Sequence, residues 1–199
     1  MDNKEISSSS GFFITIVFGI AGSLLIGLLF RGYSLFEFET PSSFVLVMGI
    51  TGAIVYSALK FKTLKDSILL CLTLLLLNLI FMGSAPISYY VRDMVLFTGF
   101  WFCIFFYKLW LKRLSDKYMF LRALGFAAIT AFVFIAASFV LILINVPFIK
   151  ISSEMISKMI LFYLQAGTIV GLGLGLGFDS AEIYLGVKNK RPKEHIRLQ

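Results

Sequence analysis

The side chains of this sequence that could bind a ligand are polar residues inside or next to long apolar segments. Arg92 and Asp93 are adjacent in the chain, and a guanidinium can hold a carboxylate or a phosphate through two hydrogen bonds. Amide and phenol groups can add directed hydrogen bonds to the polar edges of a ligand. We predict a polar, outward-facing pocket lined by Asn78, Tyr89, Tyr90, Arg92, Asp93, Asn145 and Gln165.

These residues also have an interpretation that needs no ligand. Charged residues are ordinary at a membrane interface. For each of Arg92 and Asp93 we therefore prefer a role in an interfacial ion pair over a role in ligand binding. A lone amide within a membrane segment often bonds a neighbouring helix, with an average gain of about 0.6 kcal/mol. For Asn78 and Gln165 the ligand-binding and the packing interpretations are therefore both open.

The residue inventory argues against most kinds of catalytic or metal site. The only histidine, His195, lies in the polar C-terminal segment, which excludes histidine ligands and a Ser-His-Asp triad inside the apolar part. The only cysteines, Cys71 and Cys103, lie in separate apolar segments without metal-binding spacing. The run 175–179 differs from the GxGD motif of intramembrane aspartyl proteases because its aspartate is displaced by one residue. We therefore expect no catalytic residues, no metal and no cofactor.

Six apolar segments must position the polar residues. The chain of 199 residues is 59% hydrophobic and only 15% charged, whereas soluble domains have about 45–50% apolar and about 25% charged residues. About 20 apolar residues in a helix cross the bilayer core. The sequence predicts one all-α membrane bundle over residues 1–199, with a basic tail at 188–199 and spans at 11–30, 42–59, 66–83, 92–111, 120–146 and 155–178.

The distribution of basic residues predicts which way the bundle sits in the membrane. Of the 18 Lys and Arg residues, all except Arg31, Arg92, Lys150 and Lys158 lie in the terminal segments or in connectors on the same side as the termini. Because basic segments stay in the cytoplasm, we predict a multi-pass protein of the cell inner membrane with both termini cytoplasmic. The net charge of +7 is thereby explained without nucleic acid. We expect segment 11–30 to be a retained span, since it is too long for the apolar part of a signal peptide.

Small residues recur at four-residue spacing in several spans. Gly167, Gly171 and Gly175 form one stripe of the last span, and Gly173 with Gly177 forms a roughly opposite one. Small residues let helices approach closely in lipid, so the last span is predicted to lie wedged between two neighbours. An alternative is a mobile helix or a surface for a partner subunit. Matching small residues are Gly19, Gly22, Ser23 and Gly27 in the first span and Ala123, Ala127 and Ala131 in the fifth.

Three hypotheses for function follow from this pattern. In architecture, the six short-looped spans with polar groups on the outer side resemble the substrate-binding subunits of energy-coupling-factor vitamin transporters. That resemblance implies a small polar ligand and a docking face at Gly19, Gly22, Ser23 and Gly27 for a membrane coupling subunit. The second hypothesis is a non-enzymatic structural or assembly subunit of a membrane complex. The third, an intramembrane lipid-processing enzyme, is the least favoured because it needs clustered nucleophilic, basic or metal-binding groups.

Overall fold

The described part of the chain consists of six α-helices and their short turns, without a β-strand. The computed structural model describes residues 8–31, 42–62, 64–82, 87–111, 118–145 and 152–186, so the predicted basic tail at 188–199 lies outside it. The all-α prediction is confirmed. The helices are α1 (Ser8–Arg31), α2 (Ser42–Phe61), α3 (Leu64–Met82), α4 (Ile87–Leu109), α5 (Met119–Asn145) and α6 (Ser153–Tyr184).

Each predicted apolar segment coincides with one helix, and only two boundaries differ by more than three residues. Helix α4 begins at Ile87, earlier than the predicted start at 92, because no proline or glycine interrupts the chain between Pro86 and that start. Helix α6 continues to Tyr184, beyond the predicted end at 178. It stops where Gly186 takes a φ of 62°, a left-handed conformation that commonly ends helices.

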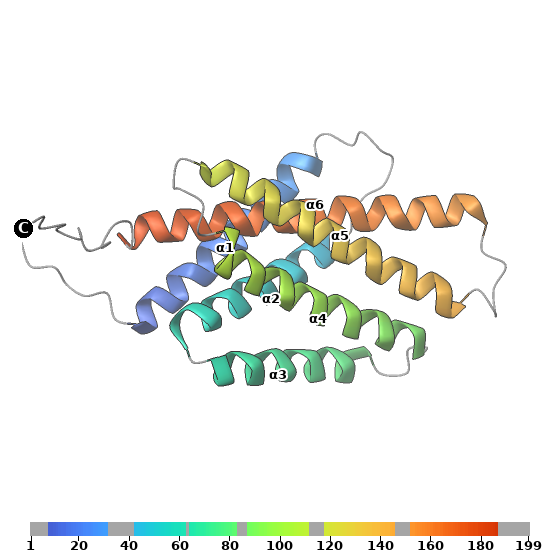
Figure 1. Cartoon of the computed structure of the whole chain (residues 1–199), viewed down its shortest axis with the longest axis horizontal. Helices are drawn as coiled ribbons and strands as arrows, with labels where there is room; N and C mark the ends of the chain where they lie inside the picture. Colours follow the sequence, from blue (N-terminus) through green and yellow to red (C-terminus); the bar gives the residue numbers. More distant parts are fainter. Residues whose placement is uncertain are drawn as a thin grey trace, which may run out of the picture.

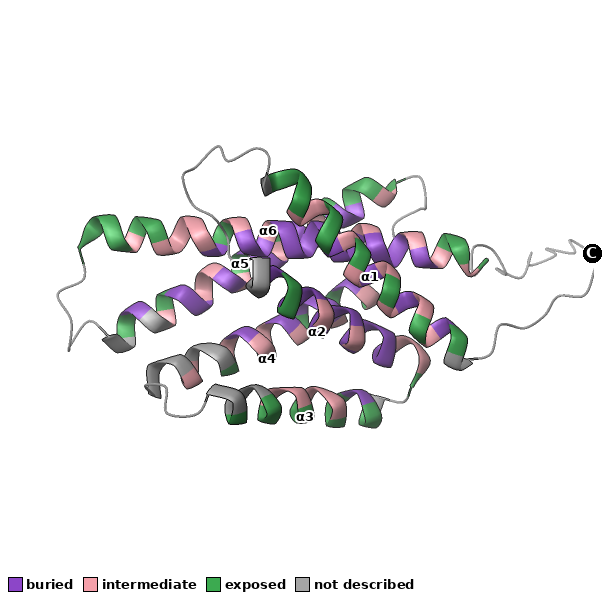
Figure 2. Ribbon diagram, turned by 180° about the vertical axis from the view of Figure 1, so that it is seen from behind, coloured by how far each residue is buried: buried purple, intermediate pink, exposed green. Residues whose placement is uncertain are grey.

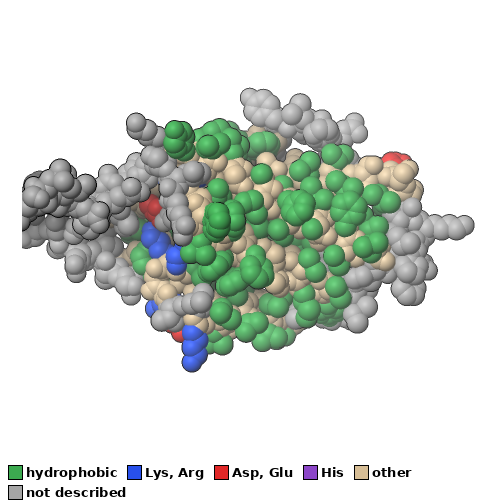
Figure 3. Space-filling view, viewed as in Figure 1, with side chains coloured by type: hydrophobic (Ala, Val, Ile, Leu, Met, Phe, Trp, Pro, Cys, Tyr) green, Lys and Arg blue, Asp and Glu red, His purple; other side chains and the backbone are tan. Residues whose placement is uncertain are grey.

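Three helices in the described residues are long and apolar enough to cross a membrane: Ser10–Phe30, Met119–Val140 and Ser153–Tyr184. Two shorter apolar helices, Val45–Phe61 and Met94–Leu109, lie beside them. The outward-facing side chains are also apolar, including Ile80 at 72% exposure and Phe132 at 71%. Hydrophobic side chains cover the middle of the face in Figure 3, and described charges gather towards the ends. This distribution fits a helical membrane protein.

Successive helices run in opposite directions, so the bundle has two distinct ends (Figure 1). Helices α2, α4 and α6 finish at the end where α1, α3 and α5 begin. We call this the charged end, because it carries Lys60, Lys108, Arg122, Asp179 and Glu182. Helix α6 has its most extensive contacts with α5 and α1, whereas α3 lies at the margin and touches only α2 and α4 among the described helices.

Helix α6 lies between α1 and α5 with its backbone against both. A Cβ added at Gly167 would lie 2.6 Å from the Cα of Ala131, and one at Gly171 would lie 2.6 Å from the Cα of Ala127. Gly175 faces Ala123 in the same way. These contacts occupy the stripe that faces α5, and its residues are buried (Figure 2).

The opposite stripe of α6 packs against α1. A Cβ at Gly173 would lie 2.5 Å from the Cα of Ser23, and one at Gly22 would overlap the carbonyl oxygen of Gly173. Gly19 packs closely on Ala53 of α2, and Gly27 has looser contacts with α2 and α6. The small residues of α1 and α6 are thus occupied by contacts within the chain. Helix α6 takes the wedged position that two opposed glycine stripes predict.

Candidate functional site

The backbone places most residues of the predicted polar pocket at the end opposite the charged end. Asn78 lies in the second half of α3, Tyr89 to Asp93 in the first turns of α4, and Asn145 at the end of α5. Tyr90 and Gln165 are half-buried. The side chains of Asn78, Tyr89, Arg92, Asp93 and Asn145 lie outside the described residues. The polar pocket therefore stays a prediction.

A cavity of about 280 Å³ lies on a different face, between α2, α3 and α4. Its volume is close to the lower limit of small-molecule pockets, which are about 300–1,000 Å³. Helix α3 contributes five of the lining residues, and the wall on α4 is mostly aromatic. The lining residues are Thr51, Val55, Ile68, Cys71, Leu72, Leu74, Leu75, Phe97, Thr98, Phe100, Trp101 and Phe102.

The cavity lies beside α3, which touches only α2 and α4 among the described helices. On α4 its wall includes the rings of Phe100, a member of the buried core, and Trp101, which packs against that core, whereas α6 has glycines where it meets its neighbours. The lining residues Leu72 and Phe102 are still 52% and 58% exposed. The cavity therefore opens sideways onto the apolar surface of the bundle.

Few polar groups line this cavity. Thr51, Thr98 and Cys71 supply two hydroxyls and a thiol. The ring of Trp101 stacks on Phe105 at 5.5 Å between centroids. The Nε1–H of Trp101 is buried and has no hydrogen-bond partner among the described residues. The arrangement suits a largely apolar molecule that accepts at most a few hydrogen bonds.

A group of charged and phenolic side chains packs between the helices at the charged end. Nη2 of Arg122 on α5 lies 3.0 Å from Oδ1 of Asp179 on α6, and the two side chains are only 7% and 1% exposed. The hydroxyl of Tyr107 on α4 donates to the same carboxylate oxygen over 3.0 Å. Three helices thus meet at one carboxylate.

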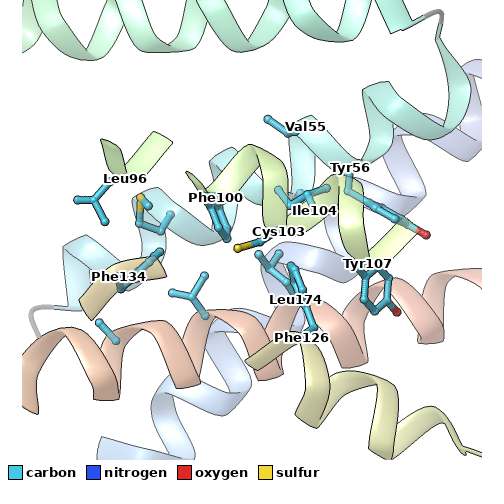
Figure 4. Packing of buried hydrophobic residues seen from close by; sticks show 14 of the residues in the cluster. Val55, Tyr56, Leu96, Phe100, Cys103, Ile104, Tyr107, Phe126, Phe134 and Leu174 are labelled. Atoms are coloured by element: carbon cyan, nitrogen blue, oxygen red, sulfur yellow. The ribbon is translucent and has the colours of Figure 1, made fainter. Parts of the chain in front are cut away.

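The same end of the bundle also joins α2 to α6. The hydroxyl of Tyr56 donates to Oε1 of Glu182 over 2.9 Å, and Nζ of Lys60 lies 3.1 Å from that oxygen. The ring of Tyr56 stacks on Phe178 with centroids 3.8 Å apart. Figure 4 shows Tyr56 and Tyr107 at one edge of the buried cluster. We call Tyr56, Lys60, Tyr107, Arg122, Asp179 and Glu182 the charged-end cluster.

The ion pairs and hydrogen bonds of the charged-end cluster connect helices to one another. Each carboxylate has a cationic partner and a phenol donor. These partners stabilise the ionised form of each acid, which does not suit it to act as a general acid. The described residues include no group of three or more His, Cys, Asp or Glu that could hold a metal ion. Removing one partner of a buried ion pair is strongly destabilising, by about 3–5 kcal/mol. The cluster therefore fixes α2, α4, α5 and α6 relative to one another.

No family model matches the chain, and neither a curated protein nor a solved structure is similar to it. The resemblance to energy-coupling-factor subunits consequently remains one of architecture. The function is inferred from the cavity and from the arrangement of charges.

The charged-end cluster is only partly visible in the sequence. Asp179 and Glu182 lie beyond the predicted end of the last span at 178, but both are within α6. A tyrosine near the end of a span is typical of the membrane interface, yet Tyr107 is fully buried. Tyr56 was not singled out. The available signal was the spacing of Asp179 and Glu182, which puts both acids near one face at the end of a glycine-rich helix.

Proposed function

We propose that this chain is a six-span protein of the cell inner membrane with both termini in the cytoplasm. Its role would be to bind a small, largely apolar molecule as the substrate-binding component of a transport system. The observation that carries the proposal is the cavity between α2, α3 and α4, which is apolar and opens sideways. A ligand can enter such a cavity from the bilayer.

The placement of charges supports the membrane topology. On α6, residues 159–178 carry no charge between Lys158 and Asp179. In a helix this stretch is about 30 Å long, the thickness of the hydrocarbon core. The other helices alternate in direction alongside it, and most described basic residues lie at the charged end. The positive-inside rule makes this end cytoplasmic.

The packing of α3 supports binding and release. Helix α3 touches only α2 and α4 within the described part of the chain, so it can shift while the α1–α5–α6 contacts stay intact. The assembly hypothesis and the docking face of the transport hypothesis both relied on glycine faces. Gly19, Gly22, Gly167, Gly171 and Gly175 instead contact other helices of the same chain, which makes a ligand-binding role the better explanation of the architecture.

A thermal-stability screen tests the proposed binding. The purified protein in mild detergent should be stabilised by at least one apolar or amphipathic small molecule, because a ligand that binds only the folded state raises its stability. Stabilisation by polar metabolites alone would contradict the apolar cavity and would favour the predicted pocket around Asn78 and Gln165. Reporter fusions to the C-terminus test the topology, and a reporter active outside the cytoplasm would overturn it.

A further inference from the structure

The cavity has basic residues on its rim at the charged end. The spacing of Lys65, Ile68 and Leu72 puts all three on one face of α3, and the last two line the cavity. Lys65 is therefore placed at the mouth of the cavity, where it is exposed. It marks the boundary between the apolar lining and the charged end.

The other two walls of the cavity also lead to lysines. Lys62 follows the end of α2 on the same helical face as Thr51 and Val55, and its N–H still donates to the Ala58 carbonyl over 2.9 Å. On α4, Lys108 shares a face with Trp101. Its Nζ donates to the carbonyl of Leu59 on α2, which places Lys108 between the two helices, about two turns from Trp101 towards the charged end.

Two acids of the described residues lie near this rim. Asp66 is exposed in the first turn of α3, about a quarter of a turn away from the face of Lys65. Glu182 is already bonded to Lys60 and Tyr56. Together with Lys60, the lysines Lys62, Lys65 and Lys108 outnumber these two acids, so the described residues at the mouth of the cavity carry a net positive charge.

We propose that the cavity binds a membrane lipid with an anionic phosphate headgroup. One of its acyl chains lies between α2, α3 and α4, and its headgroup lies at the basic rim made by Lys62, Lys65 and Lys108. This inference rests on the proposed function, since it names the ligand class of the same cavity. Apolar lining below a basic rim matches the two parts of such a lipid in the order in which the cytoplasmic leaflet presents them.

The dimensions of the cavity agree with those of a single acyl chain. The cavity of about 280 Å³ has room for about nine methylene-sized groups, if each takes the volume of a water molecule in the liquid, about 30 Å³. From Lys65 to Leu75, α3 rises about 15 Å. An acyl chain that extends from a headgroup near Lys65 would therefore lie along the α3 residues that line the cavity.

Quenching of tryptophan fluorescence by brominated lipids tests the inference in the full-length protein. The chain has two tryptophans, and Trp110 is 62% exposed, so a Trp110→Phe background leaves Trp101 in the cavity wall as the reporter. The protein is reconstituted in phosphatidylcholine vesicles that contain increasing fractions of phosphatidylglycerol or phosphatidylcholine with identical brominated chains. Brominated phosphatidylglycerol should quench at a several-fold lower mole fraction than brominated phosphatidylcholine.

Charge variants show whether the rim is responsible for the preference. Lys62→Gln and Lys65→Gln should each weaken the preference for phosphatidylglycerol by about fivefold, the effect of one basic residue near an anionic surface. Lys158→Gln, an exposed lysine at the opposite end of α6, is the matched control and should leave the preference unchanged.

The outcomes separate this inference from the proposed function. Equal quenching by the two lipids, or a preference that both rim variants retain, overturns the anionic-lipid inference while leaving an apolar ligand possible. Absence of saturable quenching by either lipid shows that no acyl chain occupies the cavity, and it also overturns the inference. In that case a positive result in the thermal-stability screen would still uphold the proposed function.

Discussion

The two sides of this bundle are packed by opposite means. On the α1–α5–α6 side, glycine and alanine bring backbones into direct contact, as at Gly171 and Ala127. On the α2–α3–α4 side, large side chains such as Phe100 and Trp101 line an open cavity. Close packing excludes a ligand but stabilises the helices, whereas loose packing gives up contacts and leaves space. The comparison assigns stability to the first side, and the proposed function assigns ligand binding to the second.

The largest effect is expected where the charged-end cluster joins the two sides. Asp179→Leu should destabilise the protein by about 3–5 kcal/mol, because it leaves the Arg122 guanidinium buried without its carboxylate. Unfolding in a denaturing detergent measures the loss. The matched test is the double variant Arg122→Met with Asp179→Leu, which should recover much of the stability. A double variant no more stable than Asp179→Leu alone would show that the pair is not coupled as the geometry indicates.

The next largest effect is expected on the closely packed side. Gly22→Leu should cost about 3 kcal/mol, because any Cβ at this position overlaps the Gly173 carbonyl. The neighbouring Ala21 is exposed, so Ala21→Leu is the control and should have little effect. The same unfolding assay compares them. Equal stability of the two variants would contradict the direct backbone contact of α1 and α6.

The two native cysteines give a measurable contrast between the sides without any mutation. Cys71 of α3 is half-buried and lines the cavity, whereas Cys103 of α4 is fully buried. A small apolar maleimide should label Cys71 at least tenfold faster than Cys103 in detergent, since only Cys71 can be reached without opening the core. Peptide mass spectrometry measures both rates in one sample. Equal rates would mean that α3 is packed as closely as the rest.

The smallest effect is expected on the outer face of α3. Ile80 is 72% exposed, and Ile80→Ala should change stability by no more than about 0.5 kcal/mol, as is usual for substitutions that remove no internal contact. A loss above about 2 kcal/mol, measured by the same unfolding assay, would place another part of the chain or a partner against this face.

Sequence predicts the closely packed side much better than the open one. The contact of α6 with α1 and α5 needs only small residues at four-residue spacing, and Gly167, Gly171 and Gly175 display that spacing directly. A cavity has no such signature. It forms where side chains from three helices leave a space between them. The residues that line it, such as Thr51, Leu75 and Trp101, are of types common in any membrane span.

The buried position of Tyr107 was unpredictable for a related reason. Tyrosine near the end of a span is favoured at the membrane interface, and the sequence alone does not distinguish an interfacial ring from one held by a buried carboxylate. Asp179 supplies that carboxylate from a helix distant in the chain. Long-range pairs of this kind become visible only when the helices are placed together.

Native mass spectrometry with two adjacent variants tests the central claim, that the α2–α3–α4 cavity holds a ligand, most directly. Leu75 lines the cavity, whereas Leu76 lies on the outer face of α3 at 58% exposure. The wild-type protein and Leu76→Trp, purified in mild detergent, should retain a bound molecule that Leu75→Trp loses, because the indole fills the cavity. A molecule retained equally by both variants, or no retained molecule in any of the three proteins, would contradict the account.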